Sequence, residues 1–142
     1  MSDVYNLARF IRAQESDYEL ALGEIQGGRK ESHWMWYIFP QIDGLGSSAM
    51  SQRFSIKSLS EARAYLEHPV LGPRLLACVE GLLQLKGRSA DEIFGFPDNK
   101  KLRSSATLFA AASSVGSPFH QLLEKYFRGE HDTPTLHLLG IS

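Results

Sequence analysis

The sequence predicts an all-α protein, a compact single-domain bundle of about seven helices. Three observations lead to this prediction. Apolar residues recur along most of the chain at the three- and four-residue spacing of one helix face. Helix-start signals precede these stretches, and no segment alternates apolar and polar residues as a half-buried strand would. The 142 residues fit one domain, residues 1–142, because no repeat, low-complexity stretch or Pro/Gly/Ser-rich linker divides them.

The first two helices are expected near the N-terminus, where apolar stripes cover residues 4–11 and 18–25. Ser16 and Glu19 have the Ser-x-x-Glu spacing of a capping box, so we expect the second helix to begin there. Gly27 and Gly28 follow this stripe, and glycine commonly ends a helix.

The segment 32–46 is irregular. Its aromatic run, residues 34–40, suits a short buried strand or an irregular helix, and periodicity does not distinguish the two. Gly44, Gly46 and Ser47 then predict a loop.

The remaining helices are predicted from their start signals and stripes. The longest stripe extends from near Pro69 to Lys86. The expected starts are the Ser58/Glu61 and Ser89/Glu92 boxes, Asp98 after Pro97, Ser117 before Pro118, and Thr133 before Pro134.

Composition excludes several function classes. Fifteen basic and sixteen acidic residues give a formal charge of −1, which argues against generic nucleic-acid binding and a polybasic membrane protein. No apolar run approaches a membrane span, and the acidic, polar start of the chain is unlike a signal peptide. We therefore expect a soluble, cytoplasmic protein. Cys78 is the only cysteine, and the five histidines lack metal-ligand spacing, so no metal site is predicted.

Two segments carry residues that a plain helical bundle does not need. In the first, basic and hydroxyl residues run into two tryptophans, and such a group can hold an anionic, ring-bearing ligand. The structural alternative is a helix C-terminus followed by core tryptophans. The residues are Arg29, Lys30, Ser32, His33, Trp34 and Trp36.

The second segment opens the helix near Asp98. Free backbone amides and the side chains of Lys100, Lys101 and Arg103 would attract an anion, unless Asp98 caps the helix itself. Ser104 and Ser105 lower helix propensity, so they either contact a ligand or allow a close approach between helices.

Four stretches of this sequence together resemble the family called domain of unknown function 1810. The stretches are Gly28-Arg29-Lys30-x-Ser32-His33-Trp34-Met35-Trp36-Tyr37-Ile38-Phe39-Pro40-Gln41, residues 64–75, residues 93–109 and residues 132–139. The resemblance covers about residues 4–139 and implies the all-helical fold called Rv1873-like. It implies no accepted activity, and no protease-inhibitor chemistry, although some members carry the label calpastatin.

Two classes of function follow from these residues. The first is a binding protein or enzyme for an anionic small molecule, nucleotide-like or ADP-ribose-like. His33 would then be the acid–base group, because imidazole titrates nearest neutral pH, and Asp98 would orient it. The second is a non-catalytic protein–protein interaction or structural domain. The first requires the two segments, some sixty residues apart, to meet in space.

Overall fold

The computed structural model describes residues 3–141, and this part of the chain contains ten α-helices and no strand. The all-α prediction is therefore confirmed. In chain order the helices are α1 (Ala8–Gln14), α2 (Tyr18–Gln26), α3 (Met35–Ile38), α4 (Ala49–Arg53), α5 (Leu59–Glu67), α6 (Leu71–Gln84), α7 (Ala90–Phe94), α8 (Asp98–Ala111), α9 (Pro118–Phe127) and α10 (Thr133–Leu139).

The helices outnumber the seven expected because several are very short. α3 has four residues and α4 has five, which is too short for an apolar period to show in the sequence. The aromatic run thus forms a single helical turn, and the only extended pairing among the described residues is a bridge between Ile42 and Ile56. This bridge holds the segment after α3 against the segment that follows α4.

The helix-start signals differ in outcome. Ser89 and Glu92 form the complete capping box at α7, as predicted. The box expected at Ser16 and Glu19 is wrong: α2 has Asp17 at its N-cap with no side-chain cap, and the Asp17 carboxylate instead accepts a hydrogen bond from the Tyr37 hydroxyl. The Asp17 side chain thus forms a contact with α3 and does not cap α2.

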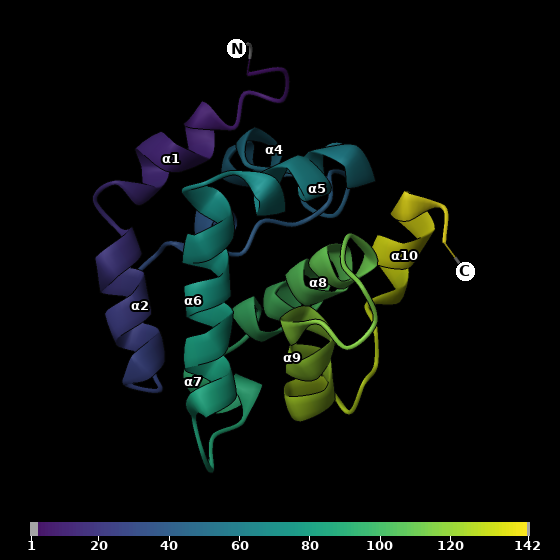
Figure 1. Ribbon diagram of the computed structural model, residues 1–142. Coiled ribbons are helices and arrows are strands. Elements are labelled where there is room, and N and C mark those ends of the chain that lie inside the picture. Colours follow the sequence, from purple (N-terminus) through teal and green to yellow (C-terminus); the bar gives the residue numbers. More distant parts are fainter. Residues whose placement is uncertain (1–2, 142) are drawn as a thin grey trace.

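Two long helices form the centre of the molecule. α6 packs against α2, α5 and α9, and α8 packs against α5, α7, α9 and α10 (Figure 1). Cys78 on α6 is buried, and burial raises the pKa of its thiol to about 12, so it is an inert part of the core. No helix among residues 3–141 is long and apolar enough to cross a membrane.

Candidate functional site

The two segments that the sequence singles out meet in space. The Lys30 amide donates a hydrogen bond to the Ile93 carbonyl at the end of α7, 2.7 Å away, which brings residues 28–34 beside the start of α8. The Lys30 ammonium then lies 2.8 Å from one carboxylate oxygen of Asp98, and the Lys101 ammonium lies 3.7 Å from the other. We call Lys30, Asp98 and Lys101 the lysine cluster.

Each lysine of the cluster also faces a tryptophan ring. The Lys30 Nζ atom is 5.1 Å from the ring centroid of Trp34, and the Lys101 Nζ atom is 5.4 Å from that of Trp36, both within the range of a cation–π interaction. The exposed fraction of the side chain rises from 8% for Lys30 to 26% for Lys101. The cluster therefore has an inner end at Trp34 and an outer end at Trp36.

The lysine cluster carries a net positive charge, because one carboxylate faces two ammonium groups. Asp98 is the first residue of α8 and does not cap the helix with its side chain. From the sequence, this carboxylate could occupy the helix amides or leave them free for an anion; in the structure it pairs with the two lysines.

Ser32 and Trp34 are held by Glu24, a residue for which the sequence pattern predicts no role at the site. The Glu24 carboxylate accepts hydrogen bonds from the Ser32 hydroxyl at 2.6 Å, the Trp34 indole N–H at 2.9 Å, and the backbone amides of Glu31 and Ser32. Burial on its own would raise the pKa of Glu24, but these hydrogen bonds outweigh it and lower the pKa to about 2. Trp34 is fully buried, so both side chains anchor the segment.

Arg29 and His33 lie apart from the lysine cluster. Arg29 is exposed and lines a separate open groove with Glu24, Glu31 and Arg88. His33 is also exposed, and within residues 3–141 its ring forms no hydrogen bond or ion pair with Asp98. Ser104 and Ser105 are buried in α8, where the Ser104 hydroxyl donates to the Lys100 carbonyl.

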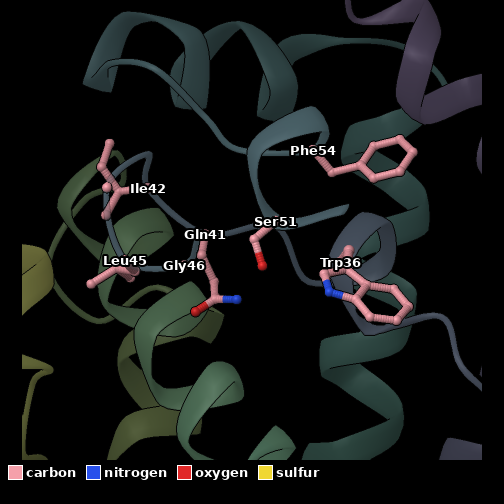
Figure 2. A pocket seen from close by; sticks show the side chains of 8 residues that line it. Trp36, Gln41, Ile42, Leu45, Gly46, Ser51 and Phe54 are labelled. Carbon is pink, nitrogen blue, oxygen red and sulfur yellow. The ribbon is translucent and has the colours of Figure 1, made fainter. Parts of the chain in front are cut away.

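A small cavity lies beside Trp36, the tryptophan that Lys101 faces (Figure 2). Trp36 forms one wall, and the loop between α3 and α4 supplies most of the others. The indole N–H of Trp36, the Gln41 amide and the Ser51 hydroxyl point toward the same space. The cavity volume of about 10 Å³ has room for no more than one water molecule.

Gln41 and Ser51 were not predicted as site residues. An isolated Gln in a loop or an isolated Ser in a short helix gives no pattern, but the glycine at position 46 indicates a tight loop. A Cβ atom added at Gly46 would lie 2.6 Å from the Ser51 hydroxyl oxygen, so a residue without a side chain is needed for the loop to close over the cavity. Among the residues described, no group of three or more His, Cys, Asp or Glu could hold a metal ion.

Comparisons with known proteins agree with this fold. The family model described as "Protein of unknown function (DUF1810)" matches residues 4–139. The crystal structure of the conserved hypothetical protein Rv1873 from Mycobacterium tuberculosis is 48% identical, with a TM-score of 0.95 over 99% of this chain and 100% of that one. No curated protein matches the chain. Since the family model spans nearly the whole sequence and the solved structure shares its entire fold, the chain belongs to the DUF1810 family of proteins of unknown function.

Proposed function

We propose that this protein binds an anionic small molecule at the outer end of the lysine cluster, between Lys101 and the cavity beside Trp36. One observation carries the proposal. The Lys101 ammonium lies over a half-buried indole while its carboxylate partner, Asp98, is shared with the better-buried Lys30. The charge of Lys101 is thus only partly compensated, and it is the accessible cation of the cluster.

The neighbouring groups suit an anion that also carries a ring. Lys101 would bind a phosphate or carboxylate oxygen in a charge-assisted hydrogen bond. The Trp36 indole offers apolar surface and an N–H donor, and Gln41 and Ser51 add polar groups at the cavity. The cavity admits only one water, so a nucleotide-like ligand would lie across its rim rather than inside it.

Asp98 has a positioning role in this proposal. Its carboxylate holds Lys30 and Lys101 on the same side of α8, so the two ammonium groups stay close in spite of their repulsion. The Lys30 side chain is 8% exposed and supports the cluster from its buried end, whereas Lys101 would contact the ligand. A catalytic role for His33 remains a separate prediction, since binding at Lys101 does not require it.

A thermal-shift screen followed by calorimetry tests the binding. The ligands are inorganic phosphate, AMP, ADP and ADP-ribose. A ligand at 100 times its Kd stabilises the native state by about 2.7 kcal/mol. For a domain of this size, that is a rise in Tm of roughly 6–10 °C.

The decisive comparison is between two lysine variants. Lys101→Ala should weaken binding of the best ligand by roughly 10- to 100-fold, the effect of a lost hydrogen bond to a charged group. Lys86→Ala removes an exposed lysine just after α6 and should bind as wild type does. Equal affinities for wild type and Lys101→Ala would refute the site. If none of the four ligands raises the Tm, the interaction-domain alternative is favoured instead.

The roles that the sequence predicts for Arg29 and His33 are tested with the same ligand. Because Arg29 lines a different groove, Arg29→Ala should leave binding at Lys101 unchanged. If Arg29→Ala abolishes binding instead, the ligand occupies the groove of Arg29 and the proposed site is wrong. His33→Ala should keep the affinity, and loss of turnover of a bound ligand in this variant alone would identify His33 as the acid–base group.

A further inference from the structure

Two histidines that are eleven positions apart come together where α9 begins and where the chain leads into α10. His120 lies in the first turn of α9, and His131 lies in the connection between α9 and α10. Their ring centroids are 6.3 Å apart, with an angle of 66° between the ring planes. Both side chains are half-buried. This pair lies outside the lysine cluster and the cavity beside Trp36.

The His120 ring is oriented by a neighbouring hydroxyl group. Ser117, the N-cap of α9, places its Oγ atom 2.7 Å from the His120 Nδ1 atom. With Nδ1–H donating to this oxygen, the Nε2 atom carries the lone pair that a metal ion needs. A histidine ligand is typically held in this way, through a hydrogen bond from its other ring nitrogen.

The ring of His131 has no hydrogen-bond partner among the described residues, whereas its backbone is held by hydrogen bonds. Within the described residues, its ring nitrogens form no hydrogen bond or ion pair. Its carbonyl, however, accepts a hydrogen bond from Arg103 at 2.8 Å, and the amide of the next residue, Asp132, donates to Thr107 at 2.8 Å. Both Arg103 and Thr107 belong to α8, so the segment that carries His131 is fixed to the centre of the molecule.

The separation of the rings is close to that of two imidazoles on one metal ion. With Zn–N bonds of about 2.0–2.1 Å in a tetrahedral site, the ring centroids lie roughly 5 Å apart. Rotation of the two side chains would close the remaining gap of about an ångström. The cationic Arg103 nearby is balanced in part by Glu130, whose carboxylate oxygen is 3.6 Å from its guanidinium group.

We propose that His120 and His131 together bind a divalent transition-metal ion of the zinc type, with water filling the other coordination positions. Imidazole nitrogen suits zinc and its neighbours in the first transition row, whereas Mg²⁺ prefers oxygen. The site uses two protein ligands, so it is an open site and not a closed structural one.

Calorimetric titration with ZnCl₂ at pH 8 tests this site, with MgCl₂ as the control ion. We expect one Zn²⁺ per chain and no binding of Mg²⁺. His120→Ala and His131→Ala should each weaken Zn²⁺ binding at least tenfold. His137→Ala, which removes an exposed histidine on α10, should bind as wild type does. Ser117→Ala should weaken binding by roughly 10- to 100-fold through loss of ring orientation.

An NMR measurement on the wild-type protein removes any dependence on whether the variants fold. Zn²⁺ should shift the imidazole signals of His120 and His131 together and at the same metal concentration. The signals of His33, His68 and His137 should stay in place. If no Zn²⁺ binds, if it binds equally well to both alanine variants, or if other histidines respond first, the two rings form only an aromatic contact and the proposal is wrong.

Discussion

Arg9 is the side chain whose replacement should affect stability most clearly. All five of its N–H donors are used. Its guanidinium group donates to the carbonyls of Tyr5, Asn6, Arg53 and Ser55 and to the Glu61 carboxylate, at 2.6 to 2.9 Å. These bonds tie the segment before α1 to the end of α4 and to α5.

The magnitude follows from the burial of this ion pair. The side chain of Glu61 is 1% exposed and that of Arg9 is 12% exposed. Arg9→Met would leave the carboxylate with the Lys57 amide as its remaining donor outside α5. Breaking a buried ion pair from one side costs about 3–5 kcal/mol. In a domain of this size, the Tm should fall by roughly 6–20 °C.

Urea and thermal unfolding provide the assay, with four variants: Arg9→Met, Glu61→Met, Arg9→Lys and the double variant Arg9→Met/Glu61→Met. Arg9→Lys keeps the charge but not the planar guanidinium group, so its free energy of unfolding should lie between that of wild type and that of Arg9→Met. The double variant Arg9→Met/Glu61→Met should be more stable than Arg9→Met alone, because no unpaired charge remains buried. The effect should also persist at high salt, since buried pairs are weakly screened. A cost below about 1 kcal/mol for Arg9→Met, or additive single-variant effects, would refute this reasoning.

Three further predictions concern the fold. Glu24→Gln should lower the free energy of unfolding most at neutral pH. The pKa of Glu24 is lowered from an ordinary 4.5 to about 2 in the folded state, so the stabilisation by the carboxylate is lost as pH falls from about 4.5 toward 2. In urea titrations, the difference in unfolding free energy between wild type and Glu24→Gln should therefore become smaller over this pH range. A constant gap at all pH values would contradict this. Gly72→Ala should cost about 1–3 kcal/mol or more, since its Cβ would lie 2.1 Å from the Leu66 carbonyl oxygen, and an unchanged urea midpoint would disprove it. Leu82→Ala should lower the free energy of unfolding by about 2–5 kcal/mol and Cys78→Ala by roughly 1 kcal/mol, and neither should change ligand affinity. Losses below about 0.5 kcal/mol would place α6 at the surface.

The candidate site could be predicted from the sequence where its residues formed a dense local pattern. Lys30, Trp36, Asp98 and Lys101 stood in two segments rich in charged and aromatic residues, and these four lie together in the structure. Glu24, Gln41 and Ser51 had no such pattern, because a single polar residue in a helix or loop is common. Their contacts depend on the path of the backbone between α2 and α3 and between α3 and α4, and the pattern of residue types does not specify that path.

Arg29 and His33 are two predicted site residues that do not join the lysine cluster. They stand beside Lys30 and Trp34 in the sequence, yet both are exposed and neither joins the lysine cluster. Adjacent residues in an irregular segment point in different directions. Which of them reaches a shared site depends on backbone dihedral angles that sequence pattern does not specify.

The long helices, and the face of each that lies in the core, follow from the residue pattern alone. The stripe predicted from near Pro69 to Lys86 forms α6, Leu71–Gln84, and because apolar spacing depends only on the helical period, its members are buried: Leu71, Leu75, Cys78, Val79 and Leu82. The polar contacts between elements depend on packing instead: Tyr37 donates to Asp17, Arg9 pairs with Glu61, and His131 lies beside His120. Hydrophobic burial is non-directional and tolerates approximate positions, whereas a hydrogen bond or ion pair requires two groups within about 3–4 Å in the right orientation. That condition is met only after the whole chain has packed.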